Sequence, residues 1–253
     1  MPAAAPLVRE IPYADPLALL GAVAGDPQVA LLHGGTPDAR GRHSLLALEP
    51  FGVLRCRDGV AERDGRPLSA GPWDALRETV ARHAVAAPAG VPFAGGAVGW
   101  LGYELGRHLE PVPRPPAGDL DLPEMVLLLC DVVVALDNAA RRAWIVSSGL
   151  PETDPAARAA RAAARLDHAA DRLAGVPPLD APPVPAAAPE ITSNFTREGY
   201  EDAVRRVIDL ILAGDVFQAN LSQRFRATPA GGPHAVRPVP APRPRQPGAV
   251  RRL

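Results

Sequence analysis

Residues 193–225 read SNFTREGYEDAVRRVIDLILAGDVFQANLSQRF, and the hydrophobic period changes once within this stretch. Thr196 is suited to cap the start of a helix, and Gly214 is suited to end one. Between them apolar residues recur at helical spacing, which predicts a helix over about 197–213 with one face made for burial. After Gly214 the period becomes two, which predicts a strand over 217–225.

The predicted strand has an apolar face and a polar face. The polar face consists of Gln218, Asn220, Ser222 and Arg224. If this face lines a pocket, Arg224 is able to hold a carboxylate through two parallel hydrogen bonds. The alternative is a solvated sheet face, or one covered by another part of the protein. Gln218, Asn220 and Arg224 are therefore candidate substrate-binding residues.

The same stretch resembles the large subunit of the chorismate-utilising enzymes. In that family Ser-Asn-Phe-Thr, a helix and Gly-Asp-(Ile/Val)-Phe-Gln-x-x-Leu-Ser-Gln-Arg-Phe open the catalytic domain. Three further segments are similar to the family's N-terminal domain: GRHSLLALEP at 41–50, GGAVGWLGYELGR at 95–107, and LPEM at 122–125 with Asp131 downstream. Together these segments cover most of residues 28–226.

The resemblance implies an α+β fold. It implies an N-terminal domain of the anthranilate synthase component I type, with sheets and flanking helices, over 1–175. A Pro-rich linker is expected over 176–190, and the first helix and strand of an incomplete chorismate-binding domain over 191–227. Residues 228–253 are rich in Pro and Arg and lack periodicity, which predicts a disordered or out-of-frame tail. We expect a frameshift or truncation there, since G+C-rich codons for residues 245–252, read one nucleotide later, can spell the family's Asn-Pro-Ala-Pro-Phe.

Two branches of the family differ at one position of this stretch. Anthranilate synthase usually carries Val-Val-Leu-Ser-Gln-Arg-Phe, whereas aminodeoxychorismate synthase component I usually carries Val-Asn-Leu-Ser-Gln-Arg-Phe. This chain has Asn220, and the Glu104–Arg107 ending of the glycine-rich block favours the same branch. We therefore favour amination of chorismate to 4-amino-4-deoxychorismate, on the route to p-aminobenzoate and folate. The alternatives are anthranilate synthase, on the route to tryptophan, and a non-catalytic module that docks an amidotransferase or binds a ligand.

The resemblance also implies a mechanism and its components. Ammonia from a glutamine amidotransferase subunit replaces the 4-hydroxyl of chorismate, while magnesium polarises the departing group. In the family the lysine nucleophile and the magnesium-binding glutamates lie in the second half of the catalytic domain. This chain contains no lysine, and arginine stays protonated and cannot attack a ring carbon. We therefore predict no catalytic residue and no metal ligand here, and we expect the 253 residues alone to be inactive.

An amino-acid effector pocket is a further feature of the family. Leu31–Gly35 lies where anthranilate synthases have Leu-Leu-Glu-Ser. Its serine helps to bind tryptophan, as a feedback inhibitor there and as a structural ligand in some aminodeoxychorismate synthases. Gly34 stands at the serine position, and the missing hydroxyl removes a donor and an acceptor. This loss makes tryptophan binding around Leu32, Gly34 and Ser44 doubtful.

Local patterns predict the remaining elements. Short apolar runs predict strands over 28–32, 44–48, 53–57, 125–136 and 143–147. Asp58-Gly59 and Asp64-Gly65 predict hairpin turns. Helices are expected over 72–85 and 154–173, the second rich in Ala and Arg and largely exposed. The glycines of 95–106 fit no phosphate-loop pattern and favour close backbone packing.

Composition limits the classes of function. The net charge is −1, and basic residues concentrate only in the tail, which argues against nucleic-acid partners and anionic membranes. The longest apolar run is too short to span a bilayer, and no leader pattern precedes it, so we expect a cytoplasmic protein without membrane contact.

The cysteines, histidines and scattered carboxylates show no pattern of a reactive or metal-binding site. Cys56 and Cys130 lie in apolar runs, which favours reduced structural cysteines. The six histidines lack the spacing of metal ligands. Four carboxylates form no recognisable pair, and we expect them to be solvated: Glu104, Asp119, Asp121 and Glu124.

Overall fold

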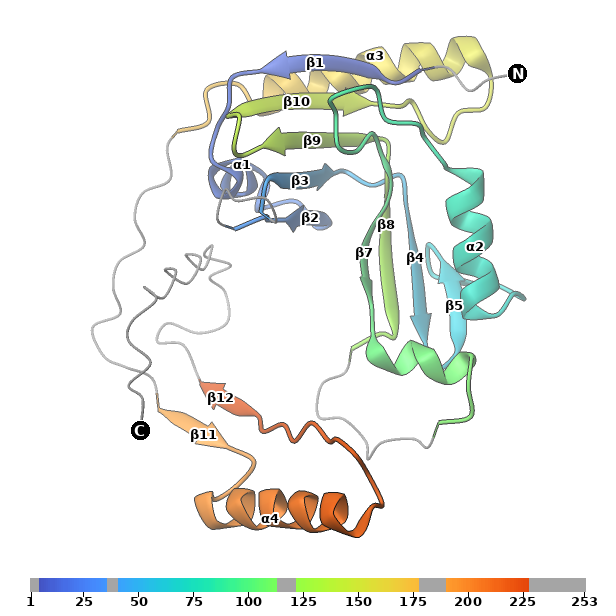
Figure 1. Ribbon diagram of the computed structural model, residues 1–253. Helices are drawn as coiled ribbons and strands as arrows, with labels where there is room; N and C mark the ends of the chain where they lie inside the picture. Colours follow the sequence, from blue (N-terminus) through green and yellow to red (C-terminus); the bar gives the residue numbers. More distant parts are fainter. Residues whose placement is uncertain (1–4, 36–40, 113–121, 178–189, 228–253) are drawn as a thin grey trace. The chain divides into compact units, whose positions relative to one another are not determined.

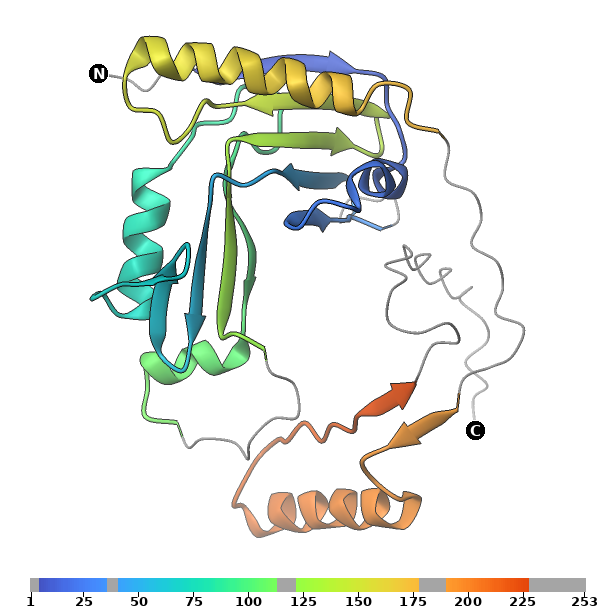
Figure 2. The same ribbon diagram turned by 180° about the vertical axis from the view of Figure 1, so that it is seen from behind.

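The computed structural model describes residues 5–35, 41–112, 122–177 and 190–227. These residues form two compact units, one within 5–177 and the other within 190–227 (Figures 1 and 2). Almost all of the expected linker, all of the expected tail, Asp119 and Asp121 lie outside the described residues. None of the described helices is long and apolar enough to cross a membrane.

The first unit contains two five-stranded antiparallel sheets. Sheet A has the order β1 (Leu7–Ile11), β10 (Arg142–Ser147), β9 (Val132–Asp137), β3 (His43–Leu48) and β2 (Val29–Leu32). Sheet B has the order β6 (Arg66–Pro67), β5 (Val60–Arg63), β4 (Gly52–Arg57), β8 (Met125–Cys130) and β7 (Gly96–Leu101). Together with the helices described below, these sheets confirm the expected α+β fold.

Two segments of the chain pass directly from one sheet to the other. Strands β3 and β4 are joined by residues 49–51, and β8 and β9 are joined by Asp131 alone. Because both connections are so short, the chain turns abruptly at one corner, and the strands of the two sheets run in different directions (Figure 1). Apolar side chains of both sheets, including Ala47, Val98 and Val133, form one core cluster beside this corner.

Helices cover the outer faces of both sheets. α1 (Pro16–Val23) and α3 (Pro155–Arg172) pack on sheet A, where Leu19 and Leu166 join its core. α2 (Pro72–Arg82) and the 3-10 helix η1 (Tyr103–His108) pack on sheet B. The side chains of Asp15 and Asp154 cap α1 and α3 by accepting a backbone N–H of the first turn.

The two hairpin turns have the conformation that their sequences predict. Asp58 and Gly59 have φ of 50° and 79°, and Asp64 and Gly65 have φ of 52° and 77°. Two successive left-handed residues form the tight turn that matches the twist of paired strands. These turns join β4 to β5 and β5 to β6, so the two Asp-Gly predictions are confirmed.

Four elements of the first unit were not predicted, namely β1, α1, β7 and η1, and β5 and β6 were indicated only by the turns beside them. The helix expected over 72–85 ends at Arg82. In β7 a Cβ on Gly99 would lie 1.9 Å from the Val126 carbonyl oxygen. This contact confirms close backbone packing in the glycine-rich block. It explains why glycine interrupts the strand pattern of Val98, Trp100 and Leu101 in β7.

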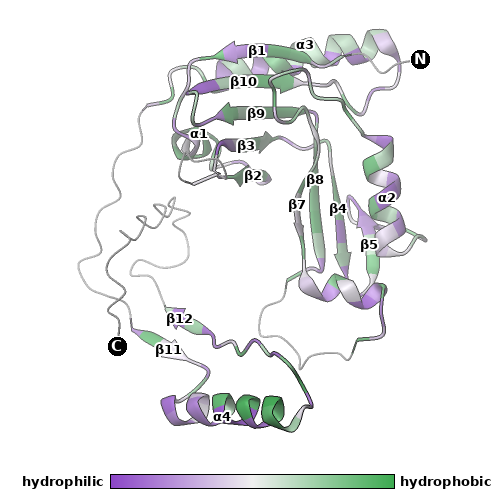
Figure 3. Cartoon of the chain, viewed as in Figure 1, coloured by the Kyte–Doolittle hydropathy of each residue, from purple (hydrophilic) through white to green (hydrophobic). Residues whose placement is uncertain are grey.

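The second unit contains β11 (Ile191–Ser193), α4 (Arg197–Ala213) and β12 (Phe225–Ala227). The helix has the bounds expected from sequence: the Thr196 hydroxyl accepts the Gly199 N–H at 3.0 Å, and Gly214 has φ of 82°. Figure 3 shows hydrophobic residues gathered toward the end of α4. No α4 residue is buried within the described residues, and 81% of Leu212 is exposed.

The strand predicted over 217–225 is wrong in its extent. Residues 215–224 form no strand, and the paired segment is Phe225–Ala227, which lies opposite Ile191–Ser193. Alternating hydrophobicity produces a strand only where a neighbour supplies the hydrogen-bond ladder. β11 offers three residues for pairing, and 94% of Phe217 is exposed.

Arginines of α3 hold the corner between the sheets. Asp131 has no exposed side-chain surface, and its carboxylate accepts from Arg161 at 3.0 Å and from Arg165 at 3.2 Å. Glu49, which begins the other connection, pairs with Arg165, with His168 at 3.0 Å and with Arg172 at 2.5 Å. We call these residues the corner cluster. The arginine face of α3 is therefore not simply the solvated face that its composition suggested.

The corner cluster predicts a pH dependence. Burial alone would raise the pKa of Glu49, but the donors Arg172, His168 and Arg165 outweigh it and hold that pKa below its usual value of 4.5. A carboxyl group whose pKa is lower in the folded than in the unfolded state stabilises the fold at pH values above its unfolded-state pKa. This stabilisation is lost as the pH falls through the folded-state pKa. We therefore expect Glu49→Gln to unfold at lower urea concentration at neutral pH and to lose less further stability on acidification.

The measurement is the urea midpoint between about pH 6 and pH 3. Glu78→Gln, which changes an exposed carboxylate of α2, is the control and should follow the unsubstituted chain. Parallel pH curves for Glu49→Gln and the unsubstituted chain would contradict the prediction.

Candidate functional site

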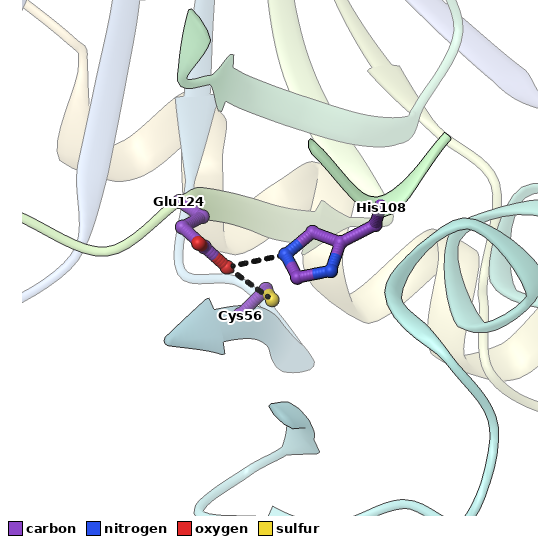
Figure 4. A group of neighbouring side chains, drawn as sticks. All are labelled: Cys56, His108 and Glu124. Carbon is purple, nitrogen blue, oxygen red and sulfur yellow. Dashed lines mark hydrogen bonds and ion pairs between the residues drawn. The ribbon is translucent and has the colours of Figure 1, made fainter. Parts of the chain in front are cut away.

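Three polar side chains from separate parts of the sequence meet at the end of sheet B (Figure 4). Cys56 lies on β4, His108 ends η1, and Glu124 immediately precedes β8. The potential ligand atoms of the three all lie within 4.8 Å of one another. We call this group the Cys–His–Glu cluster.

The hydrogen bonds of the cluster converge on one oxygen. Glu124 Oε2 accepts from Cys56 Sγ at 3.3 Å, from His108 Nε2 at 3.0 Å and from the Gly59 backbone N–H at 3.0 Å. Cys56 is fully buried, whereas 27% of the His108 side chain and 16% of the Glu124 side chain are exposed. The cluster thus has a buried side and a side open to solvent.

Electrostatics follow this arrangement. Burial and the neighbouring Glu124 carboxylate raise the pKa of the Cys56 thiol to about 12, so the thiol is protonated and donates. Burial also opposes ionisation of Glu124, but the Gly59 N–H, His108 and Cys56 hold its pKa below the usual value. Glu124 is therefore a carboxylate at neutral pH.

Backbone geometry fixes the three residues. The Glu124 N–H donates to the Cys56 carbonyl at 2.8 Å, and the Gly102 N–H donates to the Glu124 carbonyl at 2.7 Å. A Cβ on Gly59, which has φ of 79°, would lie 2.9 Å from His108 Cε1. The Asp-Gly turn thus supplies both a donor to Glu124 and the space for the His108 ring.

The sequence did not reveal this cluster. Glu124 was expected to be solvated, and this is wrong because its side chain is mostly buried and accepts three donors. Glu104 is exposed, as expected. Cys56 and Glu124 are 68 positions apart, and His108 and Glu124 are 16 apart, so no local spacing rule identifies them.

The structure brings together part of the doubtful effector pocket. The Gly34 N–H donates to the buried Ser44 hydroxyl at 3.1 Å, and Asn138 Nδ2 donates to the same oxygen at 2.9 Å. A Cβ on Gly34 would lie 2.4 Å from the Gly41 carbonyl oxygen and 2.5 Å from that of His43. A serine therefore does not fit at Gly34 without backbone movement. Leu32 is 47% exposed on β2, and Asn138 is a neighbour that sequence reasoning missed.

The candidate substrate-binding residues lie in the second unit. Gln218, Asn220 and Arg224 are exposed along the irregular segment before β12. The backbone of Arg224 is fixed by Asn194, whose side-chain oxygen accepts the Arg224 N–H at 2.8 Å. Substrate binding by these three residues stays a prediction.

The fold is similar to part of a solved structure. The crystal structure of anthranilate synthase component I from Streptococcus pneumoniae TIGR4 matches with a TM-score of 0.60 and 25% sequence identity, over 83% of this chain and 46% of that chain. The sequence model of the chorismate binding enzyme family matches residues 31–238. The chain belongs to this family.

Curated relatives carry two names. Anthranilate synthase component 1 of Cereibacter sphaeroides is 35% identical over 74% of this chain and 40% of its own length. That of Thermus thermophilus is 36% identical over 74% of this chain and 40% of its own length. Aminodeoxychorismate synthase component 1 of Klebsiella aerogenes is 30% identical over 83% of this chain and 44% of its own length. The chain spans less than half of the length of these relatives.

Proposed function

We propose that the protein represented by these residues aminates chorismate to 4-amino-4-deoxychorismate, on the route to p-aminobenzoate and folate. Asn220, within Asn-Leu-Ser-Gln-Arg-Phe, is the observation that carries this choice of branch. It lies in the segment that resembles the start of the catalytic domain.

Anthranilate synthase is the second candidate, and one observation favours it. Relatives with that name from Cereibacter sphaeroides and Thermus thermophilus are 35% and 36% identical to this chain, whereas the aminodeoxychorismate synthases of Klebsiella aerogenes and Bacillus subtilis are 30% and 26% identical. Overall sequence identity is an average over the whole matched region, and most of that region forms the two sheets and the helices on them. Asn220 lies in the segment that resembles the start of the catalytic domain, so we give it more weight.

The components of the reaction are part of the same proposal. The ammonia donor is a glutamine amidotransferase subunit, and Gln218, Asn220 and Arg224 contribute polar groups that hold the substrate. Magnesium favours octahedral sites built from oxygen ligands. The Cys–His–Glu cluster offers a single carboxylate beside sulfur and nitrogen, so it does not fit magnesium, and we derive no step through that ion.

A pair of chimeric proteins tests the branch. Residues 1–227 are joined to the remaining part of Bacillus subtilis aminodeoxychorismate synthase component 1 or, separately, of Thermus thermophilus anthranilate synthase component 1. Both are assayed with chorismate, ammonium and magnesium, and the products are separated by chromatography. We expect efficient turnover in the first chimera, and we expect Asn220→Val to lower it roughly tenfold, as the loss of one hydrogen bond does.

Gln223→Ala is the matched control, because Gln223 lies in the same segment but is not one of the candidate substrate-binding residues. Efficient turnover by the anthranilate chimera alone, or full activity of Asn220→Val, would contradict the assignment. If both chimeras fold but neither turns over, a non-catalytic docking or ligand-binding module becomes the better description.

A further inference from the structure

The Cys–His–Glu cluster combines a thiol, an imidazole and a carboxylate from three separate elements. Sulfur, nitrogen and oxygen donors of these types are the ligands that zinc takes from Cys, His and Glu in proteins. Among the described residues these three side chains form a group whose ligand atoms are close enough to share one ion. We propose that Cys56, His108 and Glu124 bind a zinc ion that fastens η1 to sheet B.

The separations of the ligand atoms can be compared with those that zinc requires. With typical zinc–ligand bond lengths and tetrahedral angles, sulfur and oxygen lie about 3.6 Å apart and nitrogen and oxygen about 3.4 Å apart. The present separations are 3.3 Å for Cys56 Sγ and 3.0 Å for His108 Nε2, each measured to Glu124 Oε2. These two separations lengthen by a few tenths of an ångström when zinc enters. The third separation, between Cys56 Sγ and His108 Nε2, is within 4.8 Å and has to come to about 3.6 Å, which rotation of the partly exposed His108 side chain supplies.

The donors and acceptors of the cluster are arranged as zinc binding requires. Two protons, on Cys56 Sγ and His108 Nε2, now point at one carboxylate oxygen. Zinc takes the place of both: the thiol loses its proton to the solvent as the sulfur–zinc bond forms, and His108 coordinates as a neutral ring with its proton on Nδ1. The Gly59 N–H keeps its bond to Glu124 and orients the carboxylate as an outer partner.

Access and surroundings are also suitable. Cys56 closes the site from the buried side, and the exposed edge of His108 leaves an entry path. Three protein ligands leave one tetrahedral position for water. The turn at Gly59 keeps its backbone N–H beside Glu124. The site lies within the first unit and does not depend on the proposed reaction.

Cobalt(II) is a direct probe, because thiolate coordination gives an intense charge-transfer band in the near ultraviolet. The untagged 253-residue chain is titrated with cobalt under a phosphine reductant. We expect this band, and we expect zinc to displace cobalt and abolish it. Cys56→Ser should lose the band, whereas Cys130→Ala should keep it, since Cys130 is the other buried cysteine and lies outside the cluster.

Thermal unfolding gives a second readout. Zinc at about 100 times its dissociation constant should raise the melting temperature by roughly 5–10 °C. His108→Ala removes a ligand at the partly exposed side and should weaken zinc binding at least about tenfold. It should also lower the metal-free melting temperature, since Glu124 loses one donor, and it should abolish the shift that zinc causes. Magnesium at the same concentration should give no shift.

Several results would overturn the proposal. A cobalt spectrum without the thiolate band, a band that survives in Cys56→Ser, or one that disappears in Cys130→Ala shows that the cluster does not hold the ion. A further contradicting outcome has two parts: Cys56→Ser lowers the stability, and zinc does not change the melting temperature of the unsubstituted chain. The cluster would then act through its hydrogen bonds alone.

Discussion

The 253 residues on their own are expected to release neither aminodeoxychorismate nor anthranilate from chorismate, ammonium and magnesium. Covalent attack on the ring requires a neutral amine, and the chain contains no lysine that could provide one. Its basic residues are arginines, whose guanidinium groups stay protonated. The expected effect is therefore a complete loss, with product no higher than in a sample without protein.

Chromatography of the reaction mixture checks this prediction, with intact Thermus thermophilus anthranilate synthase component 1 as the positive control. A tryptophan fluorescence spectrum shows whether the first unit is folded, because all three tryptophans lie in that unit. Product above the background would mean that another group acts as the nucleophile, and the mechanism implied by the family would not apply.

Asp131→Ala is expected to have the largest effect on stability. The carboxylate is fully buried and accepts from both Arg161 and Arg165, so its removal leaves two partly buried cations without this partner. Breaking a buried pair in this way costs about 3–5 kcal/mol. Such a loss is a large share of the roughly 5–15 kcal/mol by which domains are stable.

The measurement is urea unfolding followed by tryptophan fluorescence, which reports on the first unit alone. Asp167→Ala is the matched control, because the Asp167 carboxylate of α3 also pairs with an arginine, Arg9 of β1, but at side-chain exposures of 63% and 43%. An exposed pair contributes at most about 1 kcal/mol. Equal losses in the two variants would show that burial of the corner cluster contributes nothing.

Local signals in the sequence were sufficient for elements that depend on local interactions. The start of α4 depends on the Thr196 hydroxyl and its end on the left-handed Gly214, and each signal lies within a few residues of its effect. The Asp-Gly turns are local in the same way. Strands β3, β8 and β10 are recognisable because burial on both faces selects continuous apolar runs.

Features that depend on distant partners could not be predicted. The alternation around Phe217 is compatible with a strand, but the only pairing among the described residues of that unit is between β11 and β12. β7 is the opposite case, because Gly99 carries no strand preference and the strand exists through pairing with β8. The Cys–His–Glu cluster joins three segments by tertiary packing, so residue types and spacing gave no indication of it.

The corner cluster has a consequence for the order in which the chain folds during synthesis. Glu49 leaves the ribosome 116 residues before Arg165, its partner on α3. The Glu49 carboxylate in the connection between β3 and β4 therefore has no arginine partner from α3 while the strands of both sheets are being synthesised. Contacts of such separation in sequence form slowly, because a long loop must close first. We expect nascent chains that end before residue 155 to remain protease-sensitive at this connection, and chains that extend beyond 175 to become protected there.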